Sequence, residues 1–258
     1  MDILVYDKTF AGLLTAVFEV YEYKFKNPLI CPEGNARSSL FGTHHIAHTD
    51  TEKSERVWSK LDMKLSAISM NQFYKVFLSE MPGIENNLLR YVQYVIASKY
   101  NVENDYSHPD VLMIKQTAKK VDREKHRMEA FVRFALTKDQ LYYAIIQPDY
   151  NVLPLISNHF EKRYADQRWL IYDCLRKYGL YYDLEKVEEV FMVFEADLNN
   201  KDSLKAIYDE REELYQTLWQ QYFQSVNIKA RKNMKLHIQH MPKRYWKNLV
   251  EKDRKSVV

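Results

Sequence analysis

A long amphipathic segment over residues 111–133 is the feature that most constrains the fold. At about 100° per residue, its apolar side chains fall on one stripe of an α-helix. The stripe consists of Ile114, Ala118, Val121, Met128 and Val132. Ser107 to Asp110 supply a helix start, with Pro109 suited to the first turn. The pattern predicts a helix that packs against a core.

The opposite face of this helix is basic. It carries Lys119, Lys120, Arg123, His126 and Arg127. A row of cations at this spacing can hold successive phosphates, but a solvated surface face has the same pattern. Asp122, Glu124 and Glu129 are expected on the flanks, where they neutralise part of the charge, and Lys125 interrupts the apolar stripe.

The rest of the chain predicts an α+β fold, predominantly helical, with a small mixed or antiparallel sheet. We expect a single domain over residues 1–258, with a weakly marked subdomain boundary near residues 100–110. Strands are predicted at residues 3–7, 128–136, 141–147, 168–173 and 180–183. Further helices are predicted at residues 9–23, 53–61, 72–81, 84–99, 152–164, 203–223 and 233–240, with a last one after Pro242. Residues 27–45 are expected to be irregular.

Composition and motifs exclude several classes of protein. With only 5 glycines, the chain has no glycine-rich phosphate loop, and its two cysteines cannot build a four-cysteine zinc site or an iron–sulfur cluster. It also lacks the ligand pattern of zinc deaminases and the serine elbow of hydrolases. No secretory signal or spanning segment is visible, so we expect a cytoplasmic protein. We expect no cofactor.

The net charge of +3 conceals a division along the chain. Residues 227–258 hold ten Lys or Arg against two acids, a charge of +8, which leaves −5 for residues 1–226. In the tail, Tyr245 and Trp246 lie between Arg244 and Lys247. Aromatic rings flanked by cations suit single-stranded or flipped-out nucleic acid, but the same pair could dock the tail onto the protein.

Two other groups of polar residues have the chemistry of a functional site. His44, His45 and His48 could place two rings on one helix face toward a metal ion, but no third ligand is evident and we predict no metal site. Asp149 and His159 could act as a general base and a proton shuttle, with Arg163 as a phosphate anchor. The alternative for these three is turn capping and a surface pair four residues apart.

The opening strand and seven further blocks of sequence together carry a resemblance to a known family. The seven blocks are Phe10–Ala16, Thr49–Val57, Phe77–Glu80, Val121–Phe134, Pro148–Leu155, His159–Tyr164 and Met241–Trp246. In these blocks the chain resembles a bacterial family of DNA metabolism or DNA repair proteins. That family is built on an uncharacterised domain that also occurs fused behind uracil-DNA-glycosylase-like domains. The glycosylase motifs of the fused relatives are missing from this chain, so base excision is not implied.

The resemblance implies a stand-alone companion of a radical-SAM protein that acts on DNA. It strengthens the prediction that the basic helix and the basic-aromatic tail contact nucleic acid, because both fall in its most specific blocks. The predicted nucleic-acid contacts are Lys119, Lys120, Arg123, Arg127, Arg133, Arg163, Arg231, Lys232, Arg244, Tyr245, Trp246 and Lys247. Single-stranded or distorted DNA is the favoured partner.

Three functions remain open from the sequence. The first is a DNA-binding accessory protein in repair or base modification that acts with the radical-SAM partner. The second is a nucleic-acid-processing hydrolase or lyase built on His126, Asp149 and His159, which requires these groups to converge. The third is a protein-interaction scaffold without affinity for DNA.

Overall fold

The computed structural model describes residues 2–34, 43–191, 218, 238–249 and 252. By the density of its internal contacts the chain divides into two compact units, Met1–Asp122 and Arg123–Val258. The division falls inside the longest helix, α5 (Pro109–Phe131). The expectation of a single domain stays a prediction. The α+β, mostly helical fold class is confirmed.

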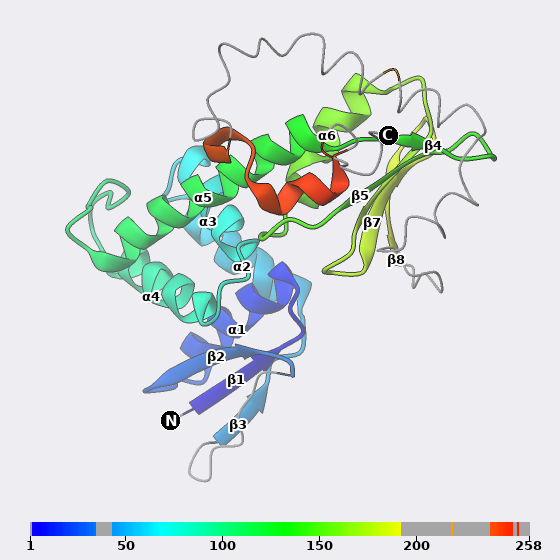
Figure 1. The fold of residues 1–258 in the computed structure, drawn as a ribbon. Helices are drawn as coiled ribbons and strands as arrows, with labels where there is room; N and C mark the ends of the chain where they lie inside the picture. Colours follow the sequence, from blue (N-terminus) through cyan, green and yellow to red (C-terminus); the bar gives the residue numbers. More distant parts are fainter. Residues whose placement is uncertain (1, 35–42, 192–217, 219–237, 250–251, 253–258) are drawn as a thin grey trace. The chain divides into compact units, whose positions relative to one another are not determined.

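The first unit is built on three parallel strands with helices around them (Figure 1). Strand β1 (Asp2–Tyr6) lies between β2 (Pro28–Pro32) and β3 (Thr43–Ile46), with Leu4 opposite both Ile30 and His45. Its other elements are α1 (Phe10–Glu22), α2 (Thr51–Asp62), α3 (Ala67–Phe77), α4 (Ile84–Ala97) and the first part of α5. Their apolar faces form one continuous core.

The second unit contains a five-stranded mixed sheet in the order β4-β5-β6-β7-β8. The strands are β4 (Ala135–Leu136), β5 (Tyr142–Ile146), β6 (Trp169–Asp173), β7 (Tyr178–Tyr182) and β8 (Val187–Phe191). Helix α6 (Leu153–Arg163) connects β5 to β6, the parallel pair, and the other pairs are antiparallel. A 3₁₀ helix, η2, spans Lys243–Asn248.

Local signals predict most helices correctly. Asp50 caps α2 by accepting a hydrogen bond from the Lys53 amide at 3.0 Å, and Ser66 caps α3. Helix α5 begins at Pro109, as expected. Most of the predicted helix over residues 203–223 lies outside the described residues, as does most of the one over residues 233–240.

The strand predictions need three corrections. Residues 27–45 are not simply irregular, because they contain β2 and most of β3, which form by pairing with β1. The outer edge of β2 is satisfied by the Asn86 side-chain amide, which bonds to Ile30 N and O at 2.9 and 3.0 Å. The strand expected over residues 128–136 is helical to Phe131, and only Ala135–Leu136 pairs as β4. Strand β8 was not predicted.

Gly12 is enclosed at the start of α1. A Cβ at this position would lie 2.1 Å from Asp7 Oδ1 and 2.8 Å from Thr49 Oγ1. Asp7 also accepts hydrogen bonds from the Thr9 amide and from the Thr49 hydroxyl. We therefore expect Gly12→Ala to lower the free energy of unfolding by about 1–3 kcal/mol, because the methyl group overpacks this turn. Urea unfolding followed by circular dichroism measures the change, and an unaltered midpoint would contradict the prediction.

Candidate nucleic-acid interface

Helix α5 has the predicted division into an apolar and a basic face. All five residues of the apolar stripe are buried, from Val121 at 0% exposure to Val132 at 9%. The predicted cations Lys119, Lys120 and Arg123 are exposed. Lys119 and Lys120 belong to the first compact unit and Arg123 to the second.

Glu124 is the main correction on this helix. It was expected on a flank, where it would partly neutralise the basic face, but its side chain is only 1% exposed. Lys125, expected to interrupt the apolar stripe, is 35% exposed and lies 3.2 Å from Glu129. Glu124 and Lys125 lie on the two sides of the stripe between Val121 and Met128, about 100° apart on the helix. Glu124 is the buried one of the two, because hydrogen-bond partners on its side of the stripe satisfy its carboxylate.

Three distant segments of the chain meet at the Glu124 carboxylate. Its Oε2 accepts hydrogen bonds from Arg244 Nη2 at 2.8 Å and from the Tyr245 hydroxyl. Its Oε1 accepts the backbone N–H of Asp149 at 2.9 Å. Arg244 Nη2 also lies 2.9 Å from Asp149 Oδ2, and Arg127 Nη1 lies 3.8 Å from Glu124. We call Glu124, Arg127, Asp149, Arg244 and Tyr245 the Glu124 cluster.

The Glu124 cluster explains the charge states of its tail residues. Burial by itself would lower the pKa of Arg244, but the Glu124 carboxylate outweighs it with help from Tyr245 and Asp149, so the pKa is raised. Burial, together with the hydrogen bond to Glu124, raises the pKa of Tyr245. Both groups therefore stay protonated at any physiological pH.

Tyr245 docks the tail onto the second unit. It is 4% exposed, its ring centroid lies 5.6 Å from that of Phe131, and the Arg244 guanidinium covers it at 4.6 Å. In this arrangement the ring has no free face on which a base could stack. Trp246 is partly buried and donates its Nε1 hydrogen to Met241 O at 3.0 Å. Tyr245 therefore fits the alternative in which the aromatic pair docks the tail onto the protein. The neighbouring Arg244 remains 42% exposed.

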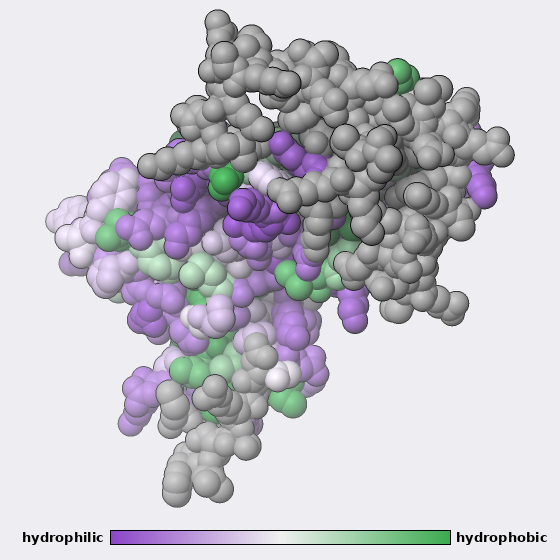
Figure 2. Space-filling view, viewed as in Figure 1, coloured by the Kyte–Doolittle hydropathy of each residue, from purple (hydrophilic) through white to green (hydrophobic). Residues whose placement is uncertain are grey.

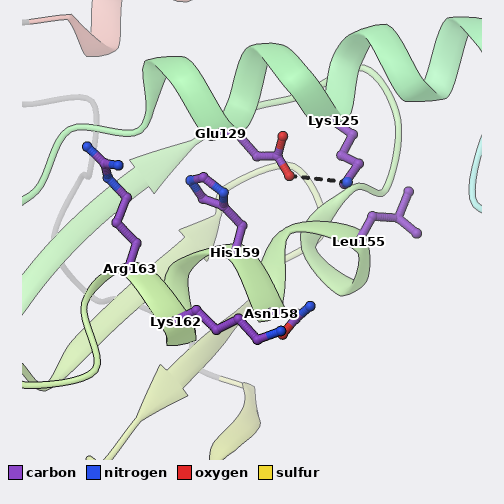
Figure 3. Close-up of a pocket in the computed structure, with 7 residues that line it drawn as sticks. All are labelled: Lys125, Glu129, Leu155, Asn158, His159, Lys162 and Arg163. Atoms are coloured by element: carbon purple, nitrogen blue, oxygen red, sulfur yellow. Dashed lines mark ion pairs between the residues drawn. The ribbon is translucent and has the colours of Figure 1, made fainter.

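A pocket of about 450 Å³ lies between the end of α5 and helix α6 (Figure 3). Its lining residues are Lys125, Glu129, Leu155, Asn158, His159, Lys162 and Arg163. His159 and Arg163 come from one turn of α6 and face the Lys125–Glu129 pair of α5 across this space. In the part of the chain that the structure describes, Lys162 and Arg163 form no ion pair, so their charges remain available.

The comparisons with known proteins identify the domain. Residues 82–251 match the sequence profile of a domain of unknown function, DUF4130. The match covers more than half of the 258-residue chain. The chain belongs to the DUF4130 family. A comparison with curated proteins finds no match.

The DUF4130 segment includes every residue of the Glu124 cluster and of the pocket. The Glu124 cluster and the pocket are both supported by an ion pair that the sequence did not reveal, between Asp173 and Arg176. Asp173, at the end of β6, is fully buried and lies 2.8 Å from Arg176 Nη1. Arg176 in turn donates to the carbonyl oxygens of Pro148 and Asp149 at 3.2 and 3.1 Å. This pair positions the loop that enters α6, but a single Asp and Arg in a hairpin turn carry no recognisable motif.

The three proposed catalytic residues of the DUF4130 protein take part in different interactions. His126 is 87% exposed, and its Nδ1 lies 3.9 Å from Glu129 Oε2. Asp149 belongs to the Glu124 cluster, and His159 lines the pocket. Among the described residues no hydrogen bond or ion pair joins any two of the three. The enzyme hypothesis therefore gains no support from their placement.

The remaining predicted cations have varied positions. Arg133 is half-buried and donates to the carbonyl oxygens of Ala130 and Val132. Arg231 and Lys232 lie outside the described residues, as does the side chain of Lys247.

No helix in the described ranges is both long and apolar enough to cross a bilayer.

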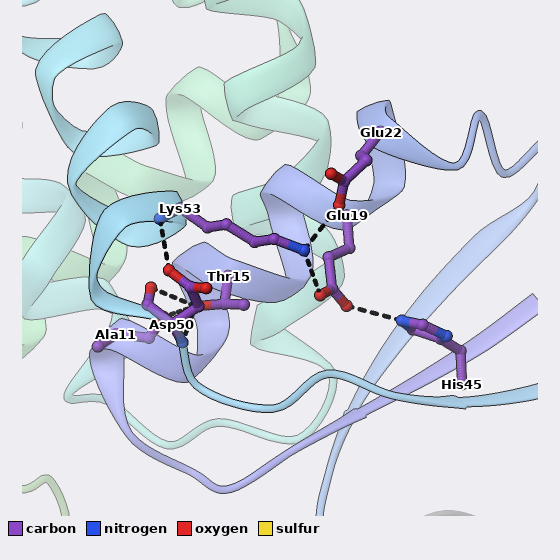
Figure 4. A network of polar contacts seen from close by, with 7 residues as sticks. All are labelled: Ala11, Thr15, Glu19, Glu22, His45, Asp50 and Lys53. Atoms are coloured by element: carbon purple, nitrogen blue, oxygen red, sulfur yellow. Dashed lines mark hydrogen bonds and ion pairs between the residues drawn. The ribbon is translucent and has the colours of Figure 1, made fainter.

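His44, His45 and His48 do not lie on a shared helix face. His44 and His45 lie on β3, where neighbouring side chains point to opposite faces, and His48 follows the strand. His45 Nε2 lies 2.7 Å from the buried Glu19 carboxylate, which also pairs with Lys53 at 2.9 Å (Figure 4). Hydrogen bonds to Glu22 and Glu19 raise the pKa of Lys53. Within the described residues no three His, Cys, Asp or Glu side chains are grouped to hold a metal ion.

Proposed function

We propose that this DUF4130 protein is a DNA-binding accessory protein in DNA repair or base modification that acts with a radical-SAM protein. The observation that carries the DNA-binding part is the pocket between α5 and α6, where Lys162 and Arg163 have no carboxylate partner among the described residues. Cations held in a concave site and left unneutralised favour a phosphate ligand. The resemblance to DNA metabolism proteins supports the choice of DNA and of the radical-SAM partner.

The visible surface of the described residues is mainly hydrophilic. On the visible face of the described residues, hydrophilic residues cover much of the surface and apolar residues form small patches between them (Figure 2). Within the described part of the tail, Arg244 is engaged by Glu124 and Asp149 and is less available to DNA than its charge suggests. We therefore place the main contact on α6 and the facing part of α5.

Fluorescence anisotropy with single- and double-stranded oligonucleotides across a salt series tests this function. Affinity should fall steeply as salt rises, because phosphate contacts release counterions. Lys162→Ala and Arg163→Ala should each weaken binding several-fold and reduce the salt slope by about one. Lys186→Ala is the matched control, since Lys186 is an exposed lysine of the same unit that pairs with Glu188 and does not line the pocket.

Two results would contradict the proposal. Absence of binding at low salt would exclude a DNA-binding role for this chain. If the chain also forms a stable complex on co-expression with a radical-SAM protein, the scaffold function would replace it. Equal losses in Lys186→Ala and Arg163→Ala would show that the general charge of the unit, rather than the pocket, attracts DNA.

A further inference from the structure

The pocket between α5 and α6 has cations suited to a phosphate group and the volume of a small-ligand site. We propose, on the basis of the DNA-binding function above, that it binds the terminal phosphomonoester of a DNA strand. The internal phosphodiesters of the strand would then contact cations outside the pocket. Charge, shape and hydrogen-bonding groups each support this assignment.

The balance of charge in the pocket matches a dianion. Lys125 and Glu129 lie 3.2 Å apart and largely neutralise each other. Two cations remain, Lys162 and Arg163, which form no ion pair among the described residues. A phosphomonoester carries about −1.5 to −2 at pH 7, whereas an internal phosphodiester carries a single negative charge. The two unpaired cations lie on either side of His159 (Figure 3), and their combined charge favours a strand end over an internal phosphodiester.

The shape of the site also favours a group of limited size. A volume of about 450 Å³ is in the range of pockets that hold small ligands, and it is bounded by two helices. A groove for the middle of a strand would instead continue past several phosphates.

Each polar side chain has a defined use toward a terminal nucleotide. The planar Arg163 guanidinium can donate two parallel hydrogen bonds to phosphate oxygens. Its central carbon, Cζ, lies 5.8 Å from the centre of the Tyr164 ring. Lys162 adds a point charge, and a ring nitrogen of His159 can donate to the phosphate. The Asn158 amide offers a donor and an acceptor for the sugar or the base.

The test uses the full chain and one short single-stranded sequence in three forms, with no terminal phosphate, a 5′-phosphate or a 3′-phosphate. We expect one phosphorylated form to bind about tenfold more tightly than the unphosphorylated form, a difference of about 1.4 kcal/mol. Arg163→Ala should reduce this preference to about one, and Arg163→Lys should retain part of it because the charge remains. Lys186→Ala should leave the preference unchanged, and dTMP should compete more strongly than thymidine.

The outcomes separate this inference from the proposed function. Salt-sensitive binding with equal affinity for all three oligonucleotides would overturn the terminal-phosphate assignment and leave DNA binding in place. Competition by dTMP for a phosphate probe without binding of any oligonucleotide would overturn the DNA-binding function and retain the phosphomonoester site. A full preference in Arg163→Ala would place the phosphate outside this pocket and overturn the inference.

Discussion

Glu124→Ala is expected to lower the free energy of unfolding by about 2–4 kcal/mol. The carboxylate is 1% exposed and accepts hydrogen bonds from Arg244, Tyr245 and the Asp149 amide. Its removal leaves the buried Tyr245 hydroxyl without its acceptor and Arg244 without its main counter-charge. The loss should be smaller than for a fully buried pair, because Arg244 is 42% exposed and keeps Asp149 as a partner.

Urea denaturation measures this loss, and limited proteolysis shows whether the segment around Tyr245 is released. Glu129→Ala is the matched control, since it removes the same side chain from the same helix. Glu129 is 17% exposed and pairs with Lys125, so we expect a change of about 0–1 kcal/mol. Glu124→Gln should be intermediate, because the amide oxygen still accepts a hydrogen bond. Equal stability of Glu124→Ala and Glu129→Ala would refute the central role of the Glu124 cluster.

The second large effect is expected at the β6–β7 hairpin. Asp173→Ala should destabilise the protein by about 3–5 kcal/mol, because it removes the carboxylate that pairs with the largely buried Arg176 guanidinium. Asp173 is 0% exposed and Arg176 only 10%, and Asp173 Oδ1 also accepts the Leu175 amide at 2.8 Å. The same substitution releases the constraint on the Pro148–Asp149 loop, so we also expect weaker DNA binding.

Two further variants separate the ion pair from the turn at this hairpin. Asp173→Asn retains an acceptor for the backbone amides but removes the charge, so any remaining loss reports the pairing with Arg176. Asp183 makes the same type of turn at the next hairpin by accepting the amides of Glu185 and Lys186, with no buried arginine. Asp183→Ala should therefore have a clearly smaller effect on the urea midpoint. A comparable loss in both alanine variants would mean that the turn matters and the ion pair does not.

Short-range patterns were sufficient for most helices and for part of the pocket. The caps at Asp50 and Ser66 and the proline at residue 109 act within a few residues of the chain, so the sequence displays them directly. The spacing of His159 and Arg163 likewise predicted a shared face of one helix, and both line the pocket. Strands β2 and β3 escaped prediction because their pairing with β1 joins residues far apart in the chain.

The sequence by itself determined the fold class, the long amphipathic helix and the basic character of its exposed face. These properties follow from the local periodicity of apolar residues and from the positions of charged residues in the sequence. Only the tertiary structure decided which charges are engaged. Arg244 contributes to the basic tail in sequence, yet it lies against Glu124, a residue 120 positions earlier. The pocket keeps Lys162 and Arg163 unpaired because no acidic side chain of the described residues reaches them. Charge availability therefore depends on contacts between distant segments, which only the folded chain establishes.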